Sequence, residues 1–550
     1  MEQLRGNRWI TLLLLCIGFL MILVDTTIVN VSIPTIIKDL GASLSDIEWI
    51  ISGYALTFAA FLITFGRLGD MYGRKNFFLG GLAVFTIASY FSGQATSPDS
   101  LIVARLFQGV GGAMISPSTL SIISTTFRGK ERAIAFGIWG AVAGLAVALG
   151  PVLGGYFSTY QNWRWIFYVN IPIGIIGILL GALIIQETND HPKHKLDWAG
   201  MITSTIGFFL LVFGLIEGQN YGWIAPKKDF VLGSFTWNNP DLSIILPAII
   251  LGIIFLVIFL FIQLAKTRRG TEPAVNITFF QSRAFSYGLI TIAVLALGEF
   301  SSLFTVPIFL QSLRGYTPIQ SGVATLPLAI AVLIAAPTSA QIVNRLGTKW
   351  VISLGIFFEF LGLFLLSRLT VDTTAVQLII PFFILGAGIG LAIAQNTQAT
   401  LSEIPHQNSG SASGVLNTIR QVGTAFGIAI IGAVLASRLT ANLKTEIDTI
   451  PNLPDQVKQQ IVDTAAKAST SYQSNQNTGY VLEVPVAIRN NPTALIAFTK
   501  QQAETQTEIK AAVARALAKS ISQAIEVGAL FVLLGALLSL LMPNIKTQHE

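Results

Sequence analysis

Long apolar stretches alternate with short polar segments along almost the whole chain. Each stretch holds about 20 residues, the length that an α-helix needs to span a membrane. The stretches are continuous and lack the alternation of apolar and polar residues that is typical of a transmembrane β-barrel. The pattern predicts about fourteen transmembrane helices, near residues 9–32, 46–67, 77–95, 100–126, 135–158, 165–185, 197–216, 242–264, 284–310, 318–341, 350–369, 376–398, 410–436 and 521–542.

The composition agrees with this prediction. Hydrophobic residues make up 52% of the chain and charged residues only 11%, whereas a soluble globular protein has about 25% charged residues. The chain is too apolar to be soluble as a whole, so we expect an all-α protein embedded in the lipid bilayer. The first apolar run can span a membrane and lacks a small-residue cleavage site, which predicts a retained helix and not a signal peptide.

The positions of the basic residues predict the topology. The net charge of +6 lies in short loops and not on a basic stripe with aromatic residues, so we expect no nucleic-acid partner. An even number of helices puts both termini on one side of the membrane. The loops of that side hold most of the basic residues of short loops, for example Arg74, Lys75, Arg128, Lys130 and Arg132. The positive-inside rule then predicts cytoplasmic termini in the plasma (inner) membrane.

One connection is long and polar. Residues 437–520 lie between the last two predicted helices, and the topology places them outside. Segments 453–468 and 503–520 are predicted to be helical, and the second is expected to run into the final helix. Long loops are often functional, so this segment is a candidate for gating or for binding a periplasmic adaptor protein. The alternative is a passive surface hairpin.

The two halves of the chain share a weak internal repeat. Three pairs of segments match in the same order, GRLGDMYGRK at 66–75 with AQIVNRLGTK at 340–349, VSIPTI at 31–36 with FTVPIF at 304–309, and FQGVGG at 107–112 with ILGAGI at 384–389. Related halves are found in many secondary transporters. We therefore predict a six-helix bundle over 1–190, two inserted helices over 191–270, and a second six-helix bundle over 271–550 that includes the segment 437–520.

The loop GRLGDMYGRK has a pattern with a readable physical logic. Gly66 and Gly73 permit a close approach of helices and a tight turn. Asp70, near a helix end, can pair with a basic residue or with the N-terminus of a neighbouring helix. A plain positive-inside turn would explain Arg74 and Lys75, but it does not explain an aspartate framed by glycines.

A second pattern of small residues lies in the fifth predicted helix, in GLAVALGPVLGG at 144–155. Gly150 and Pro151 are expected to bend the helix, while Gly154 and Gly155 would allow tight packing. The same residues are compatible with a simple packing face of small side chains.

These patterns resemble motifs of the major facilitator superfamily. The loop at 66–75 matches the motif G-x-x-x-D-x-x-G-R-K between helices 2 and 3 of that family, with full spacing. LIVARLFQGVGGAM at 101–114 resembles its helix-4 motif, and residues 144–155 resemble its antiporter motif. Three further stretches resemble landmarks of its fourteen-helix drug/proton antiporter branch, namely LVDTTIVNVSIP at 23–34, WRWIFYVNIPIG at 163–174 and LDWAG at 196–200.

The resemblance implies both a fold and a function. It implies two six-helix bundles plus two inserted helices, with alternating access around a mid-membrane site. It also implies proton-coupled efflux of small lipophilic, often cationic drugs or biocides. The alternative is a proton-coupled exporter of one endogenous metabolite or lipid. The repeat and the antiporter motif disfavour a channel or a non-transporting sensor.

Ionisable residues inside predicted spans are candidates for function, because a charge within a membrane is costly. Asp25 lies in the first predicted helix, roughly 13 Å below its outer end at about 1.5 Å per residue. Arg105 lies in the outer half of the fourth predicted helix, so contact between the two side chains is feasible. We predict that Asp25 binds a proton or a cationic substrate and that Arg105 modulates it. The alternative is a static pair that braces the two helices.

Further ionisable residues lie in the second half. Glu299 is a second coupling candidate, because a carboxylate in an aromatic-lined cavity could hold a lipophilic cation. Its alternative is a capping or water-exposed glutamate. Glu359 lies on a helix that the resemblance places at the periphery, so we expect it to make an interhelical hydrogen bond. Arg420 could pair across helices or line a gate.

Neutral polar residues add to the candidates. Asn30, Tyr54, Gln395 and Asn396 are candidates to line the cavity, and Gln398 lies beside the last two. They could orient a substrate or simply hydrogen-bond to neighbouring helices.

The sequence lacks the motifs of several other classes of protein. The chain has no G-x-x-x-x-G-K-[ST] phosphate loop, so we do not expect ATP to be the energy source. The histidines lie in loops or in the tail, which argues against an intramembrane metal centre. We recognise no nucleophile–base pair, and we expect neither an enzyme nor a cofactor. The single cysteine, Cys16, permits no disulfide within the chain.

Overall fold

The structure is a computed structural model, which describes residues 6–42, 44–187, 196–232, 235–450, 453, 458–459, 461–462 and 492–544. Within these residues, thirteen helices are long and apolar enough to span a membrane. In addition, the 32-residue helix α5 (Gly129–Tyr160) covers the predicted span at 135–158. Every predicted span therefore corresponds to a helix, and the prediction of an all-α membrane protein is confirmed.

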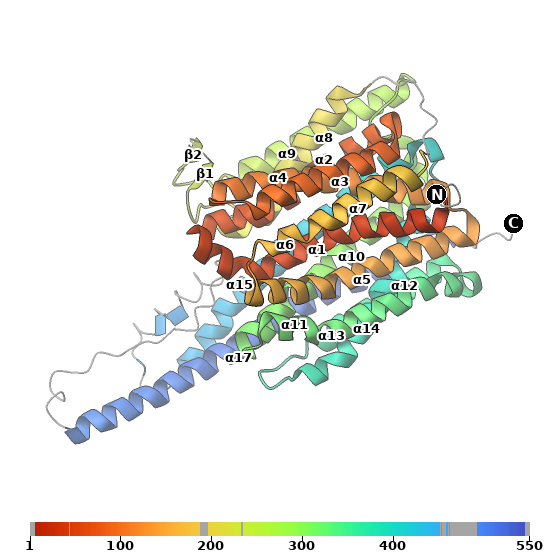
Figure 1. The fold of residues 1–550 in the computed structure, drawn as a ribbon. Coiled ribbons are helices and arrows are strands. Elements are labelled where there is room, and N and C mark those ends of the chain that lie inside the picture. The colour runs from red at the N-terminus through yellow and green to blue at the C-terminus, as the bar shows by residue number, and fades with distance from the viewer. Residues whose placement is uncertain are drawn as a thin grey trace.

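The first part of the chain folds into a group of helices that pack on one another (Figure 1). These are α1 (Arg8–Leu40), α2 (Leu44–Tyr72), α3 (Arg74–Gly93), α4 (Pro98–Thr126), α5, α6 (Trp165–Tyr168) and α7 (Asn170–Ile184). Helix α1 packs on α5 and α7, and α4 packs on α2 and α3. The predicted span at 165–185 is divided into α6 and α7. Pro172 lies just after this break and lacks the amide hydrogen that would bond to Tyr168 in a continuous helix.

The middle of the chain holds α8 (Trp198–Tyr221) and α9 (Ile245–Arg268), which pack against each other. Helix α8 also packs on α2 and α15. Between them lies an antiparallel pair of short strands, β1 (Phe230–Leu232) and β2 (Phe235–Trp237), with Phe230 opposite Trp237. The hydropathy pattern did not predict these strands.

Helix α9 has an exposed apolar face. Ile253, Ile254 and Phe261 are 49%, 46% and 66% exposed. A continuous apolar surface of this kind is unfavourable in water but favourable against lipid tails. We therefore infer that α9 faces the bilayer.

The second half contains the remaining helices. They are η2 (Ile277–Gln281), α10 (Arg283–Ile308), the π-helical turn η3 (Phe309–Leu313), α11 (Pro318–Ala324), α12 (Leu326–Leu346), α13 (Thr348–Leu366), α14 (Ala375–Thr400), η4 (His406–Asn408), α15 (Ser409–Asp448) and α17 (Pro492–Ser539). Helix α10 packs on α15, α17 and α14, and α13 packs on α14 and α17. Contacts of α2 with α15 and of α5 with α11, α12 and α14 join this half to the first. The exact division at residues 190 and 270 stays a prediction.

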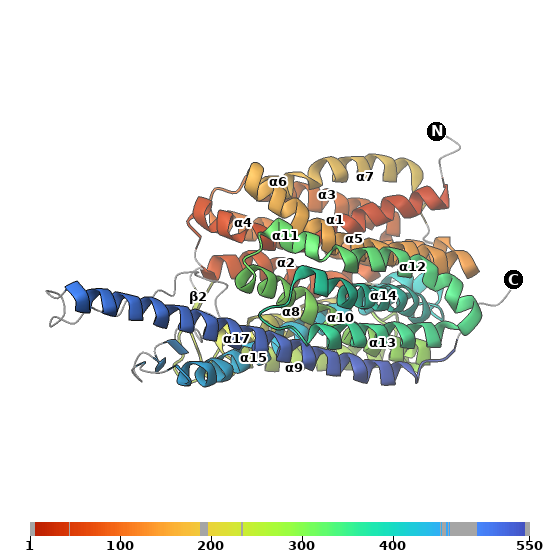
Figure 2. The ribbon, with the colours of Figure 1, turned by 90° about the horizontal axis from the view of Figure 1, so that it is seen from below.

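Helices α15 and α17 extend beyond the other helices at one end of the molecule (Figures 1 and 2). The 48 residues of α17 correspond to a length of about 72 Å at 1.5 Å per residue, more than twice the ~30 Å of a bilayer core. The prediction that 503–520 continues into the final helix is confirmed. Most of the other predicted helix, 453–468, lies outside the described residues.

The projecting part has an apolar core of its own. Leu443 and Ile447 of α15 are buried together with Ile509, Ala512 and Ala516 of α17. At the opposite end of the molecule, α1 begins and α17 ends (Figure 1). We call the end where α1 begins the inner end and the projecting end the outer end.

Candidate coupling sites in the helix bundle

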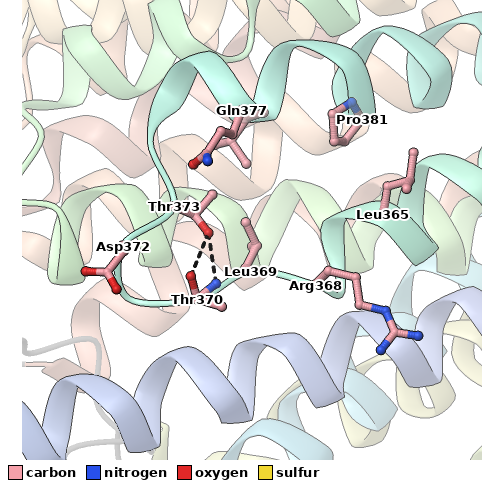
Figure 3. A pocket seen from close by; sticks show the side chains of 9 residues that line it. Leu365, Arg368, Leu369, Thr370, Asp372, Thr373, Gln377 and Pro381 are labelled. Atoms are coloured by element: carbon pink, nitrogen blue, oxygen red, sulfur yellow. Dashed lines mark hydrogen bonds between the residues drawn. The ribbon is translucent and has the colours of Figure 1, made fainter.

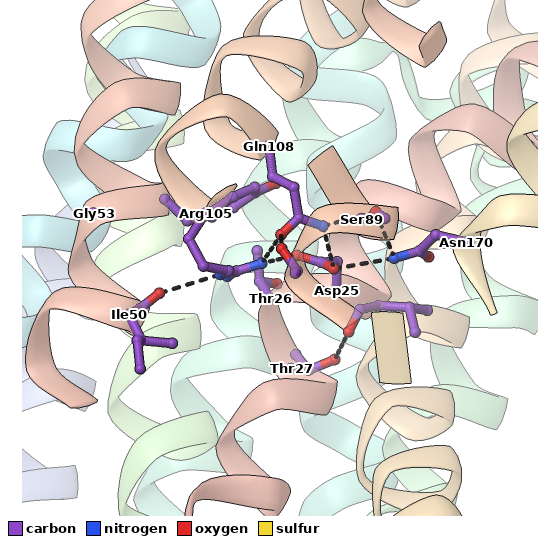
Figure 4. A network of polar contacts seen from close by, with 12 residues as sticks. Asp25, Thr26, Thr27, Ile50, Gly53, Ser89, Arg105, Gln108 and Asn170 are labelled. Carbon is purple, nitrogen blue, oxygen red and sulfur yellow. Dashed lines mark hydrogen bonds and ion pairs between the residues drawn. The ribbon is translucent and has the colours of Figure 1, made fainter. Parts of the chain in front are cut away.

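Asp25 of α1 and Arg105 of α4 form a buried ion pair (Figure 4). Arg105 Nη1 donates to Asp25 Oδ2, and the two residues are only 2% and 1% exposed. Asp25 Oδ1 accepts two more hydrogen bonds, from Gln108 Nε2 and from Asn170 Nδ2, each at 3.1 Å. The contact that the depths of Asp25 and Arg105 made feasible is therefore formed.

Neighbouring groups extend this pair into a network across several helices. Ser89 Oγ of α3 accepts from Gln108 Nε2 at 2.8 Å and from Asn170 Nδ2 at 3.3 Å. Arg105 Nε donates to the carbonyl of Ile50 at 3.1 Å, which ties in α2. The network thus joins α1, α2, α3, α4 and α7, so that moving Asp25 would disturb all of them.

Tyr54 lies against the same arginine. The Arg105 guanidinium carbon is 4.5 Å from the centre of the Tyr54 ring, a cation–π contact. The Tyr54 hydroxyl is buried and has no hydrogen-bond partner among the described residues. Tyr54 therefore belongs to the Arg105 network, while its predicted place on a cavity wall stays a prediction. The side chain of Asn30 lies outside the described residues.

The sequence motifs did not predict that Asp25 would bind Gln108 and Asn170 or that Ser89 would join them. Two of them lie in stretches that had been singled out, Gln108 in LIVARLFQGVGGAM and Asn170 in WRWIFYVNIPIG. A search for polar residues within those motifs would have found both. Ser89 carries no such signal.

A second ion pair lies in the other half of the molecule. Arg420 Nη2 of α15 donates to Glu299 Oε2 of α10 at 3.2 Å, and each side chain is 15% exposed. One of the two roles considered for Arg420, pairing across helices, is therefore confirmed. The coupling role of Glu299 stays a prediction.

Among the described residues, Glu359 does not form the interhelical hydrogen bond that we expected, so this prediction was wrong. Glu359 of α13 is fully buried, yet neither carboxylate oxygen has a hydrogen-bond partner among the described residues. The assumption of a peripheral position explains the error. Helix α13 contacts α10, α14 and α17, and Glu359 is buried among helices rather than at the periphery.

Asp70 has both of the partners that its position predicts. Arg74 donates to Asp70 Oδ1 from Nε at 3.0 Å and from Nη2 at 2.8 Å. The backbone N–H groups of Gly410 and Ser411, at the start of α15, donate to the same carboxylate at 2.8 Å each. Because a helix N-terminus attracts negative charge, this contact fixes the inner end of α2 to α15.

The remaining motif residues shape the same loop. Gly73 has φ +107°, a conformation that disfavours other residues. The N–H groups of Arg74 and Lys75 donate to Glu187 Oε1 at 2.9 and 3.4 Å. Arg74 is buried and also donates to the carbonyl of His406. The loop thus holds neighbouring segments of the chain together. It also carries the basic residues that indicate the topology.

Helix α5 uses its small residues for close packing. A Cβ on Gly150 would clash with Thr27 of α1, and a Cβ on Gly155 would lie 2.5 Å from Ile319 Cγ1 of α11. Gly154 is buried as well. The packing interpretation is confirmed, whereas the bend expected at Gly150 and Pro151 stays a prediction.

Gln395 and Asn396 of α14 are buried and partly bonded. Gln395 Nε2 donates to Ser339 Oγ at 2.7 Å, and Asn396 Nδ2 donates to the Gly288 carbonyl at 3.0 Å. Their side-chain oxygens have no partner among the described residues. These contacts fit the alternative of hydrogen bonding to neighbouring helices, and a role toward a substrate stays a prediction.

A pocket of about 310 Å³ opens between α13 and α14 (Figure 3). It is lined by the end of α13, the following turn and the start of α14, where Thr370 N–H donates to Thr373 Oγ1 at 2.9 Å. None of the predicted site residues lines it. We therefore assign no transport role to this pocket.

Comparison with known proteins identifies the family. The chain matches the Major Facilitator Superfamily over residues 15–428. It belongs to this superfamily. As a member, it is a multi-pass membrane transport protein, and the resemblance seen in its motifs is confirmed.

Two relatives have names that concern antibiotic export or multidrug transport. The tetracenomycin C resistance and export protein of Streptomyces glaucescens is 32% identical over 438 residues, which cover 79% of this chain and 77% of that protein. The multidrug transporter protein MdtP of Bacillus subtilis (strain 168) is 28% identical over 551 residues, which cover 100% and 95%.

A solved structure supports the fold of this superfamily member. The bacterial homolog to the human lysosomal transporter Spinster, in an inward-facing and unoccupied conformation, matches with a TM-score of 0.54 and 15% identity. The match covers 97% of this chain and 96% of that chain. At this identity the likeness concerns the fold alone.

Proposed function

We propose that this transporter exports lipophilic, often cationic drugs or biocides in exchange for protons. The observation that carries the proposal is the buried Asp25–Arg105 pair, a carboxylate on one helix held by a cation on another. The names of the relatives, which concern resistance, export and multidrug transport, support the choice of substrates. We place the protein in the plasma (inner) membrane with cytoplasmic termini, in keeping with the charge of its loops.

The contacts around Asp25 suggest how a proton acts. Protonation would neutralise the carboxylate and weaken its bond to Arg105. The guanidinium would keep two neutral acceptors, Gln108 Oε1 at 2.9 Å and the Ile50 carbonyl at 3.1 Å. Helix α1 would then be held less tightly to α4 than in the charged state. Protonation would therefore favour a second arrangement of these helices over the present one.

Replacing Asp25 by asparagine tests this proposal. In vesicles with an imposed proton gradient, we expect D25N to lose gradient-driven efflux of a dye panel. The control is D39N on the same helix, because Asp39 lies outside the apolar span and pairs with Arg164. Gradient-driven transport by D25N at the wild-type rate would leave Asp25 as a static brace.

Export of a single endogenous compound is the second candidate. It is favoured by the tetracenomycin C relative, whose name concerns one compound. A strain without the transporter distinguishes the two candidates. Hypersensitivity to several unrelated dyes or biocides supports the multidrug proposal, whereas accumulation of one metabolite or lipid supports the alternative.

We also propose that the projecting part of α15 and α17 binds a periplasmic adaptor protein. Its own apolar core and the length of α17 support a surface that reaches away from the bilayer. Deletion of residues 445–500 should abolish co-purification of the adaptor and leave transport in vesicles intact. Unchanged co-purification would contradict this proposal.

A further inference from the structure

Glu359 stands apart from the other acidic residues of the helix bundle. It is 0% exposed, and both of its carboxylate oxygens lack a hydrogen-bond partner among the described residues. Three helices surround it. A Cβ on Gly298 of α10 would lie 2.5 Å from Glu359 Oε1 and would also clash with Val532 of α17, while a Cβ on Gly388 of α14 would lie 2.9 Å from the Glu359 Cα.

This environment favours a neutral acid. An ionised carboxylate without a paired cation or hydrogen bonds is very unfavourable in an apolar interior, so such a group takes up a proton instead. The group shown beside the carboxylate is the uncharged Gly298 of α10, Val532 of α17 lies beside the same glycine, and Gly388 of α14 packs on the Glu359 backbone. A charged residue lies nearby on α10, where Glu299 directly follows Gly298 in the chain.

Helix α10 therefore connects Glu359 to the second ion pair. Gly298 contacts the buried acid, and the next residue, Glu299, binds Arg420 of α15 at 3.2 Å. Glu299 and Arg420 are each 15% exposed, whereas Glu359 is fully covered. A rotation or shift of α10 would change the surroundings of both carboxylates at once.

We propose that Glu359 is a second proton site of the transport cycle, which stores a proton behind the Glu299–Arg420 pair. When α10 shifts, the proton passes from Glu359 to the carboxylate of Glu299. Glu299 becomes neutral, and Arg420 exchanges it for the anion left on Glu359, so that neither charge stays without an ionic partner. The total charge is unchanged, and Glu299 then exchanges the proton with water. This inference rests on the proton-coupled function proposed above.

Spectroscopy tests the stored proton without any transport. Infrared spectra of the purified wild-type protein at neutral pH should contain the C=O stretching band of a protonated carboxylic acid that E359Q lacks. The matched control is E217Q, because Glu217 is also a buried acid within a membrane-spanning helix, α8, but accepts from Asn220 Nδ2 at 3.0 Å. A wild-type band that is unchanged in E359Q would overturn the inference.

Transport measurements test the coupling. Glutamine has nearly the same shape as a protonated glutamate, so we expect E359Q to keep substrate exchange without a gradient and to lose gradient-driven uphill transport. E217Q should resemble the wild type in both assays. Uphill transport by E359Q at the wild-type rate would overturn only the role of Glu359. Wild-type transport that ignores the gradient would overturn the proposed function, and the coupling role with it.

Discussion

Acidic residues in this molecule differ in how many donors surround them. Asp25 and Asp70 each accept hydrogen bonds from an arginine and from two further donors, while Glu359 accepts none from the described residues. Hydrogen bonds to charged groups contribute about 1.5–3 kcal/mol each, so the number of donors decides which form of a buried acid is stable. The donors around Asp25 and Asp70 suit an ionised carboxylate. The surroundings of Glu359 suit a neutral carboxylic acid.

Asp197 offers a test of this argument outside the membrane spans. It lies just before α8 and accepts from Lys266 Nζ at 2.8 Å, from the Gly200 and Ala274 N–H groups at 2.8 and 3.0 Å, and from Gln263 Nε2 at 2.9 Å. Burial alone would raise its pKa, but these donors outweigh burial and hold the pKa below its ordinary value. A lowered pKa contributes stability above the pKa of the unfolded state, and that stability is lost as the pH falls through the folded pKa.

We therefore expect D197N to lower the free energy of unfolding by about 1–3 kcal/mol at neutral pH. The difference from the wild type should shrink as the pH falls below the folded pKa of Asp197, because both side chains are then neutral. Thermal unfolding in detergent over a pH series measures this, with the exposed Asp241 replaced in D241N as the control. A constant difference at all pH values would contradict the electrostatic explanation.

The depth of a residue along its helix shows which contacts are feasible. Asp25 and Arg105 lie at matching depths on their helices, and they do meet. The environment of Glu359 could not be predicted in this way, because it depends on the rotation of α13 toward α10, α14 and α17. Apolar runs that are hydrophobic on all sides carry no information about that rotation.

At the scale of elements, glycines decide where helices from the two halves approach closely. A Cβ on Gly66 of α2 would clash with the Gly410 carbonyl of α15, and a Cβ on Gly414 would lie 2.6 Å from the Leu62 carbonyl. Both contacts involve backbone atoms, which cannot rotate away as a side chain can. The close approach also brings Asp70 to the N-terminus of α15.

Replacing Gly66 by alanine should therefore separate α2 from α15 at the inner end. We expect G66A to lower the thermal stability and to slow transport, since the contacts of Asp70 with Gly410 and Ser411 would lengthen. G69A on the same helix is the control, because the nearest atom to its Cβ would be Ser118 Oγ at 3.7 Å, an ordinary contact. Equal effects of the two substitutions, in unfolding and in transport assays, would argue against a specific joint.

The elements themselves were predictable where an apolar run is long. All the predicted spans are helices, because a chain in lipid must satisfy its backbone hydrogen bonds within each segment. Three features were not predicted, namely the break between α6 and α7, the break between α11 and α12, and the strands β1 and β2. The strands have only three residues each and lie in a polar stretch, where periodicity gives no signal.

At the scale of the whole molecule, the two halves touch near both ends. Gly66 and Gly410 meet toward the inner end, and Gly155 of α5 meets Ile319 of α11 toward the outer end. Alternating access by rocking requires the halves to part at each end in turn. The contacts at each end must then break at some stage, so a permanent link at either end should arrest the cycle.

A disulfide at the outer end tests this requirement. A Cβ on Gly155 would lie 2.5 Å from Ile319 Cγ1 and 3.5 Å from its Cα, and replacing Ile319 removes the Cγ1 atom. The Ile319 Cβ lies no closer to the Gly155 Cβ position than this Cα does. The distance between the two Cβ atoms therefore suits a disulfide, whose Cβ atoms lie about 3.5–4.5 Å apart. The only native cysteine, Cys16, is buried and is not expected to interfere.

We expect the double variant G155C/I319C to lose transport on oxidation and to regain it on reduction. The single variants G155C and I319C, treated in the same way, show whether loss comes from the substitutions or the oxidant. Mass spectrometry of proteolytic fragments confirms the link. If the linked protein transports at the rate of the reduced form, α5 and α11 do not part during the cycle. The opening would then have to occur elsewhere along the contact between the two halves.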